Sequence, residues 1–434
     1  MDPSPSFPFP EAETSQRPAP SDSVSPIHSA AFRGAVTGAD AYRGVRLAVR
    51  LEGNLLRVGN RFVRLERYRE IAFLAIGTAA TSQAMALNDV LADRLTQGFL
   101  ASPFPVPKQL NFRSVLAPSG WPGEPGMEGI RASAQELCED LGERDLLIAL
   151  VSPGALGVLG APPTGIDAAA WRTWLEELYQ GGLTGADVGR VVRVLGDGLV
   201  GGGLAKVAGR AEIETLEVDR GDGASVGGGP TRPVFETERR EVRALLARAG
   251  VVDRLDPALR ARLDSDPTRA QSGAATNHRP VVISGPADAL AGAASAVGER
   301  KWMPRLAGLY LAGDSAGVAS DFLSRLEVMG RQYAETVREA KRLGLVAFAM
   351  STLGLPEGVD ERPFMAPWIR STVARLAGRD ATIGLMRTAG GHGELPPGLV
   401  ATADGRVQSL PMPAGVTDVG LLLVAVLPLA SRSA

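Results

Sequence analysis

Cysteine and long apolar runs are scarce in this chain of 434 residues. The only cysteine, Cys138, excludes an intramolecular disulfide and a cysteine-rich metal site, and its place in an apolar-periodic helix indicates a packing role. The longest late apolar run, 420–427, is far shorter than the roughly 20 residues of a membrane-spanning helix, and is typical of a buried strand. The amino terminus lacks the basic start and apolar stretch of a secretory signal. We therefore expect a cytoplasmic protein without a membrane partner.

Strong charge is also lacking. The formal net charge is -2, with 45% hydrophobic and 22% charged residues, as in an ordinary globular protein. This balance points to no nucleic-acid partner and leaves oligomerisation open. The length favours two domains over one compact core.

The distribution of residue types along the chain predicts where those domains lie. Residues 1–35 are crowded with Pro and Ser and are predicted to be a disordered tail. Residues 41–263 are expected to form the first domain and residues 280–434 a smaller α/β domain, with a linker-like segment at 264–278.

Buried strands alternating with helices dominate the first domain. Strands are predicted at 71–76, 145–151 and 212–218, the first two as buried apolar runs, and their alternation with helices predicts a Rossmann-like α/β/α sandwich on a parallel sheet. A short hairpin is expected before them, from strands at 45–49 and 55–58. For the second domain, the pattern predicts a strand at 280–284, helices at 316–350 and 367–377, and strands near 382–387, 398–402 and 419–427.

Small residues follow the predicted strands, where an open α/β sheet binds its ligands. Four such loops are Gly77-Thr78-Ala79-Ala80, the stretch 152–158, the glycines 201–203, and the pair 217–222 with 228–231. Their order resembles the glycerate 2-kinase family, also called MOFRL or DUF4147, over roughly residues 68 to 255.

The individual motifs resemble those of that family unequally. Thr78 stands where the family's Gly-Lys-Ala-Ala has lysine, and Val200 replaces a second lysine before the glycines. Arg193 alone is kept from an Asn-x-Val-Arg-Lys-His-Leu-Ser stretch. The most specific match is Gly221-Asp222 with Gly229-Pro230-Thr231, which resembles Ser-Asp-Val-x-Gly-Asp followed by Ser-Gly-Pro-Thr.

The resemblance implies ATP-dependent phosphoryl transfer to the 2-hydroxyl of glycerate or a similar small hydroxy acid, with Mg²⁺. It implies that Asp219 and Asp222 serve the metal or the hydroxyl group, and that Arg193 neutralises anionic oxygens. The residues expected to contact substrate or phosphate are Thr78, Ser152, Gly154, Gly201, Gly202, Gly229 and Thr231. The second domain offers His392, Glu394 and Asp404 as further candidates.

Simpler interpretations stand beside these assignments. Asp219 and Asp222 could form a solvated turn, Gly201 and Gly202 could serve only close packing, and a lone loop histidine such as His392 is usually just solvated. The missing lysines favour a catalytically degenerate homologue that binds a small anion or a protein partner. A third hypothesis is an isomerase-like sugar-phosphate binder that needs neither Mg²⁺ nor ATP.

Other enzyme classes lack their motifs here. The chain has no Gly-x-x-x-x-Gly-Lys-Ser/Thr phosphate loop, no Gly-x-Gly-x-x-Gly after a strand and no Gly-x-Ser-x-Gly elbow. These absences disfavour a P-loop kinase, a simple nicotinamide-dependent dehydrogenase and a serine hydrolase.

Overall fold

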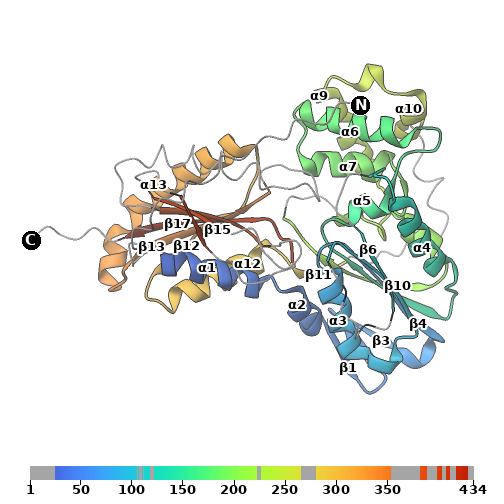
Figure 1. Ribbon diagram of the computed structural model, residues 1–434, viewed down its shortest axis with the longest axis horizontal. Helices are drawn as coiled ribbons and strands as arrows, with labels where there is room; N and C mark the ends of the chain where they lie inside the picture. Colours follow the sequence, from blue (N-terminus) through green and yellow to red (C-terminus); the bar gives the residue numbers. More distant parts are fainter. Residues whose placement is uncertain are drawn as a thin grey trace, which may run out of the picture.

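The computed structural model describes residues 25–104, 106, 110, 112–117, 122–221, 226–264, 280–352, 382–388, 398–402, 407–410 and 417–428. These residues form two lobes, each built on one six-stranded sheet (Figure 1). The predicted α/β class and the division into a parallel-sheet domain and a second sheet domain are confirmed.

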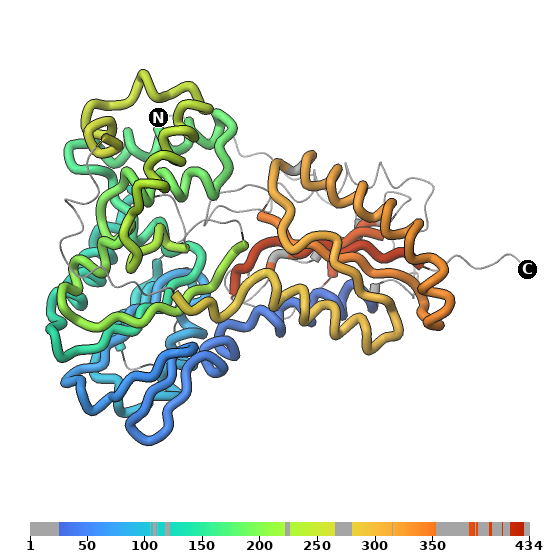
Figure 2. The backbone as a smooth tube through the Cα atoms, turned by 180° about the vertical axis from the view of Figure 1, so that it is seen from behind, coloured from blue at the N-terminus to red at the C-terminus, as the bar shows by residue number. Residues whose placement is uncertain are grey.

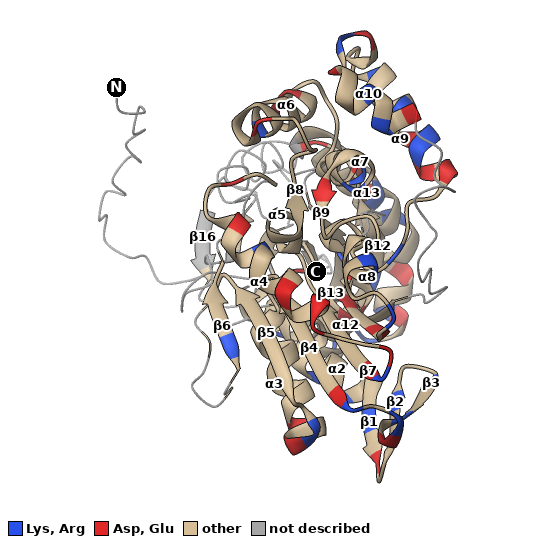
Figure 3. Ribbon diagram, turned by 90° about the vertical axis from the view of Figure 1, so that its right-hand side faces the viewer, with Lys and Arg blue, Asp and Glu red and all other residues tan. Residues whose placement is uncertain are grey.

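The first lobe is a doubly wound parallel sheet. Its strand order, β11-β10-β7-β4-β5-β6, runs outward in both directions from the pair β4 and β7. The middle of β4, β5 and β7 carries no charged residue (Figure 3). The strands are β4 (Glu70–Ile76), β5 (Gln97–Ser102), β6 (Arg113–Leu116), β7 (Asp145–Val151), β10 (Glu212–Val218) and β11 (Val281–Ser284).

Helices cover both faces of this sheet. Alternate residues of β4 enter opposite cores: Phe73 and Ala75 pack on one side, Ala72 and Leu74 on the other. Helix α3 (Ala80–Leu91) packs in the first of these cores, and α4 (Met127–Glu139), α5 (Ala155–Leu159) and α8 (Gly203–Val207) pack in the second. Helix α7 (Gly185–Leu195) contacts α6 (Ala168–Gln180), α9 (Glu236–Arg248) and α10 (Pro257–Asp264), and this group lies beyond α5 at the end of the lobe (Figure 1). A short ladder joins β8 (Gly160–Ala161) to β9 (Asp197–Gly198).

The predicted hairpin is correct at its turn and wrong at its start. Strands β1 (Val49–Glu52), β2 (Leu55–Val58) and β3 (Arg61–Arg64) form an antiparallel sheet, but residues 45–48 belong to helix α2 (Ala41–Ala48). The carboxylate of Asp40 caps this helix by accepting the Tyr42 N–H. Ala41, Gly44 and Val45 then supply a buried stripe at helical spacing.

The second lobe carries a mixed sheet in the order β12-β13-β17-β14-β15-β16. Helix α12 (Pro286–Gly298) lies on one face and α13 (Ser315–Glu339) on the other (Figure 1). The strands are β12 (Met303–Leu311), β13 (Gly344–Ser351), β14 (Thr382–Arg387), β15 (Gly398–Thr402), β16 (Val407–Leu410) and β17 (Leu421–Pro428). The predicted strands near 382–387, 398–402 and 419–427 are confirmed.

The helix predicted over 316–350 is too long. Residues 344–351 form β13 because every one of them is buried between its neighbours β12 and β17, which an amphipathic helix would not require. Strand β12 was not predicted at all. The second predicted helix, 367–377, lies outside the described residues.

The disordered tail predicted for residues 1–35 is wrong for its last part. Residues 25–35 belong to helix α1 (Ser25–Gly38), which packs beside α12 in the second lobe (Figure 2). Ile27, Ala31 and Phe32 are buried there at helical spacing, and this burial stabilises the helix. Residues 1–24 lie outside the described residues.

Within the described ranges, the chain passes between the lobes at two places. It leaves the second lobe after α1, at Ala39 and Asp40, and returns to it at Gly285, because β11 pairs with β10 in the first sheet. Residues 280–284, predicted to open the second domain, therefore belong to the first. The Ser284 hydroxyl donates to the Ala39 carbonyl over 2.7 Å, so the two crossings are bonded to each other.

Candidate functional site

The carboxyl ends of three neighbouring strands define the candidate site. Ile76, Val151 and Glu217 lie in one row across β4, β7 and β10. The loops that follow therefore emerge at one level, with Thr78 and Asp219 on the outer two strands. A strand spacing of about 4.8 Å puts these two loops roughly 10 Å apart. The point lies where the strand order reverses, the usual binding crevice of a doubly wound sheet.

Ser152 and Gly154 follow β7, the middle strand of this row. Ser152 is fully buried; its Oγ accepts the Ala79 N–H over 3.0 Å and donates to the Ile76 carbonyl over 3.2 Å. The Thr78 N–H donates to the Pro153 carbonyl over 2.8 Å. Gly154, at φ 91°, provides the left-handed turn before α5. The Ser152 hydroxyl thus holds the two loops together, and its contact with a ligand stays a prediction.

The amides of the glycines that were expected to contact phosphate are also used in internal hydrogen bonds. The N–H groups of Gly201 and Gly202 donate to the carbonyls of Gly228 and Gly229, over 2.9 and 3.0 Å. The Gly229 N–H in turn donates to the Val226 carbonyl over 3.0 Å. These amides have no donor left for a phosphate, so the packing interpretation of Gly201 and Gly202 holds and their predicted phosphate contact does not. The same applies to the Gly229 amide.

Thr231, the last residue of the best motif match, lies beneath this loop. It is 5% exposed, and its Oγ1 is 2.9 Å from the hydroxyl oxygen of Thr215 on β10. This arrangement does not form the predicted contact between Thr231 and a ligand. The hydroxyl instead fastens the 226–231 loop to the sheet.

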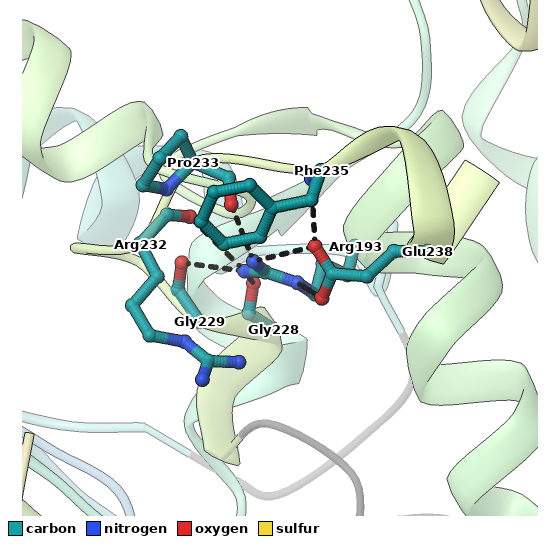
Figure 4. A network of polar contacts seen from close by, with 7 residues as sticks. All are labelled: Arg193, Gly228, Gly229, Arg232, Pro233, Phe235 and Glu238. Carbon is teal, nitrogen blue, oxygen red and sulfur yellow. Dashed lines mark hydrogen bonds and ion pairs between the residues drawn. The ribbon is translucent and has the colours of Figure 1, made fainter. Parts of the chain in front are cut away.

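Arg193 organises the same loop from α7 (Figure 4). Its guanidinium is buried at 3% exposure and pairs with the Glu238 carboxylate, with Nε 2.8 Å from Oε1. Its Nη atoms donate to the carbonyls of Gly228, Gly229, Arg232 and Pro233 over 2.8–3.2 Å. Every N–H of the fork is thereby used. The predicted contact with anionic oxygens is wrong, and Arg193 is a positioning residue.

Two threonine hydroxyls remain available at the reversal point. Thr78 and Thr81 lie one turn apart at the start of α3, and are 4% and 9% exposed. Neither Oγ1 has a hydrogen-bond partner among the described residues. A buried hydroxyl without a partner costs about 1–3 kcal/mol, so such a pair beside a crevice indicates a site for a polar ligand. Thr81 was missed from the sequence because a threonine in a first helical turn carries no distinctive signal.

Asp219 directly follows β10 on the other side of the crevice. Its Oδ1 accepts the Gly221 N–H over 2.9 Å, and its own N–H donates to the Ser284 carbonyl over 2.9 Å. The second carboxylate oxygen has no hydrogen-bond partner within the described ranges. Arg220, next in the chain, is 4% exposed and brings a buried cation to the same loop. Asp222 lies outside the described residues.

The second lobe borders this loop. A Cβ at Gly221 would lie 2.7 Å from Pro286 Cγ and 3.4 Å from Tyr310 Cδ2, so the Asp219 loop touches both the hinge and β12. The Tyr310 hydroxyl is paired with that of Thr352 at the end of β13. These two residues were not found from the sequence. The candidates His392, Glu394 and Asp404 lie outside the described residues.

The described residues offer only part of a metal site. No three His, Cys, Asp or Glu side chains come together within them. Mg²⁺ bound with a nucleotide needs only one or two protein carboxylates, because phosphate oxygens and water complete its shell. The free oxygen of Asp219 fits that requirement. None of the helices in the described part of the chain is long and apolar enough to span a membrane.

Comparison with known proteins agrees with this architecture. Residues 27–264, more than half of the chain, match the family described as "Domain of unknown function (DUF4147)". A protein of Agrobacterium vitis, provisionally named a hydroxypyruvate reductase, is 25% identical over 325 residues, which are 74% of each chain.

Two solved structures share the fold. A protein of Pyrococcus horikoshii OT3 matches with a TM-score of 0.65 and 16% identity, over 93% of this chain and 98% of that one. A glycerate kinase of Thermotoga maritima matches with a TM-score of 0.64 and 16% identity, over 92% of this chain and 98% of that one.

Proposed function

The chain belongs to the DUF4147 family, and on that premise we propose that it is a glycerate kinase-type phosphotransferase acting on a small hydroxy acid. The observation that carries this proposal is the pair of buried, unpartnered hydroxyls of Thr78 and Thr81 after β4, a strand that ends in the same row as β10, which Asp219 follows. The name of the Thermotoga maritima neighbour supports the choice of reaction.

Each polar group at the crevice has a place in this reaction. Thr78 and Thr81 donate hydrogen bonds to the carboxylate of the acid, and Arg220 supplies positive charge beside it. Asp219 accepts a hydrogen bond from the reacting hydroxyl and takes its proton as phosphate arrives. ATP is the proposed phosphate donor. Mg²⁺ would be held by Asp222 together with the phosphates, whose charge it would neutralise when bound, and the free oxygen of Asp219 would stay available to the hydroxyl.

The reductase name of the Agrobacterium vitis relative would require a nicotinamide cofactor, and the first strand-to-helix turn argues against one. A dinucleotide pyrophosphate needs free amides and glycines at this turn. Here the N–H groups of Thr78, Ala79 and Ala80 already donate to Pro153, Ser152 and Gly77. The phosphotransferase proposal does not need those amides.

Replacing Asp219 by Asn should lower turnover by about 100-fold, because loss of a general base typically costs at least that factor. Asparagine can still accept the Gly221 N–H, so the melting temperature should change little. The measurement is coupled ADP release with Mg-ATP and D-glycerate. The exposed Asp253→Asn is the matched control, and equal rates for Asp219→Asn and wild type would contradict the assignment.

A second candidate function is ligand binding without turnover. It is favoured by Thr78 in place of a lysine and by the full engagement of Arg193, which together remove two cations from the crevice. This candidate predicts that D-glycerate raises the melting temperature while no glycerate-dependent ADP appears. ADP release that requires glycerate excludes it.

A further inference from the structure

A groove separate from the candidate site runs across the hinge. Its volume is about 590 Å³, and its walls come from α1 and α12 of the second lobe and from α2 and Ile283 of the first. That volume is within the range of small-molecule sites, about 300–1,000 Å³. The groove therefore contacts both lobes at the two chain crossings.

Close packing of α1 on α12 gives the groove its floor. The two helices run antiparallel in direct backbone contact: a Cβ at Gly34 would lie 2.4 Å from the Gly292 carbonyl oxygen, and one at Gly38 would lie 2.1 Å from that of Asp288. Small residues, Ala30, Gly34, Gly38, Ala291 and Gly292, line the groove along this contact. The site thus has a defined shape.

Unused hydrogen-bond donors dominate the lining. Arg33 on α1 and Arg43 on α2 are exposed, and neither guanidinium has a hydrogen bond or ion pair with another described residue. Arg300, at the end of α12, donates to the Ala296 carbonyl over 2.8 Å and keeps its remaining N–H groups. The paired N–H groups of each guanidinium match the spacing of the oxygens of a carboxylate or phosphate.

Three carboxylates also line the groove, and two of them use one oxygen each in a helix cap. Asp40 accepts the Tyr42 N–H over 3.0 Å, and Asp288 accepts the Gly285 N–H over 2.9 Å, so both cap helices. Glu299 lies beside Arg300 at the far end. The formal charges balance, but the capacity left over in the groove is mainly that of donors.

We propose that this groove is a binding site for a small polyanion carrying phosphate or carboxylate groups, distinct from the proposed catalytic site. A ligand held by Arg33 and Arg43 at once joins the second lobe to the first. Because the hinge residues Ala39 and Ser284 are bonded beside the groove, such a ligand fixes the angle between the lobes. The site is therefore placed to regulate closure over the crevice.

The test is isothermal titration of the full chain with inorganic tripolyphosphate and, separately, with citrate, at constant ionic strength. Arg33→Gln and Arg43→Gln should each weaken binding of the preferred probe by about tenfold or more, as expected for loss of charge-assisted hydrogen bonds. The exposed Arg50→Gln on β1 is the matched control and should bind like wild type. Asp219→Asn should also bind like wild type, which separates this site from the crevice.

The two probes distinguish the ligand classes: tighter binding of tripolyphosphate indicates a phosphate ligand, and tighter binding of citrate a polycarboxylate. The variants alter exposed side chains, and unchanged melting temperatures verify that they fold. The proposal is overturned if neither probe binds wild type at millimolar concentration, or if both arginine variants bind as tightly as the Arg50→Gln control.

Discussion

Replacing Arg193 by Met should lower the free energy of unfolding by about 3–5 kcal/mol, the usual cost of breaking a buried ion pair from one side. The change leaves Glu238 without its cationic partner and removes the Arg193 donor from four carbonyls of the 228–233 loop, of which those of Gly228 and Gly229 keep the N–H groups of Gly201 and Gly202. Urea unfolding followed by circular dichroism measures the change. A loss of activity in this variant should accompany loss of stability, as expected of a positioning residue.

Two comparisons isolate the role of the guanidinium fork. Arg193→Lys keeps the charge but cannot reach Glu238 and the carbonyls together, so it should recover little of the lost stability. Arg240→Met removes an exposed pair with Glu236 on α9, at 3.4 Å, and should cost about 0.5 kcal/mol or less. If Arg193→Met unfolds at the wild-type urea concentration yet fails to bind ligand, that result would support a direct contact between Arg193 and the anionic oxygens of the ligand.

Acidification should destabilise the second lobe through His28. Burial lowers the pKa of this imidazole to about 3; Nε2 is 3.0 Å from the Thr382 hydroxyl oxygen, and Nδ1 has no partner. The unfolded chain binds a proton near pH 6.5, whereas the folded chain does not until about pH 3. The contribution of His28 to stability is therefore complete above pH 6.5 and is lost as the pH falls, by about 2 kcal/mol between pH 7 and pH 5.

The pH dependence of the wild-type unfolding free energy does not isolate His28, because a second buried group titrates in the same pH range. Burial raises the pKa of the Glu214 carboxyl to about 7, so its contribution is present below pH 4.5 and is lost as the pH rises toward 7, opposite in sign to that of His28. The decisive quantity is the difference in unfolding free energy between wild type and His28→Gln. That difference should change by about 2 kcal/mol from pH 7 to pH 5. A constant difference would show that His28 titrates alike in the folded and unfolded chain.

The doubly wound sheet was predictable because its strong signals are local. Strands β4 and β7 are apolar runs after one acidic residue, while β10 mixes Ile, Leu and Val with Glu and Thr; each strand is followed by small residues. Helix α1 was missed because Pro and Ser in residues 1–24 mask the apolar spacing of the residues that follow. Strand β12 was missed because Pro304 and Gly308 interrupt its alternation, and its register shifts at Gly308.

The candidate site was only partly predictable. The motif spacing pointed to the Asp219 loop and the turn at Thr78, which follow strands that end in one row. The roles of Arg193, Ser152, Gly201 and Gly202 depend on which internal carbonyls and amides they meet, and those partners lie up to 76 residues away in the chain. Such non-local hydrogen bonds leave no pattern in a single sequence. The lobe assignment of β11 failed for the same reason, since it depends on pairing with β10.

The most direct measurement is thermal unfolding of the full chain and of Thr78→Val/Thr81→Val, with and without D-glycerate and Mg-ATP. Removing the two unpartnered hydroxyls should stabilise the ligand-free protein by about 1 kcal/mol or more. Wild type should gain up to about 2.7 kcal/mol from ligand at 100 times its dissociation constant, and the variant should gain far less. A ligand-free variant that is more stable and no longer responds to ligand supports the crevice as the binding site. An equal ligand-induced shift in both proteins contradicts it.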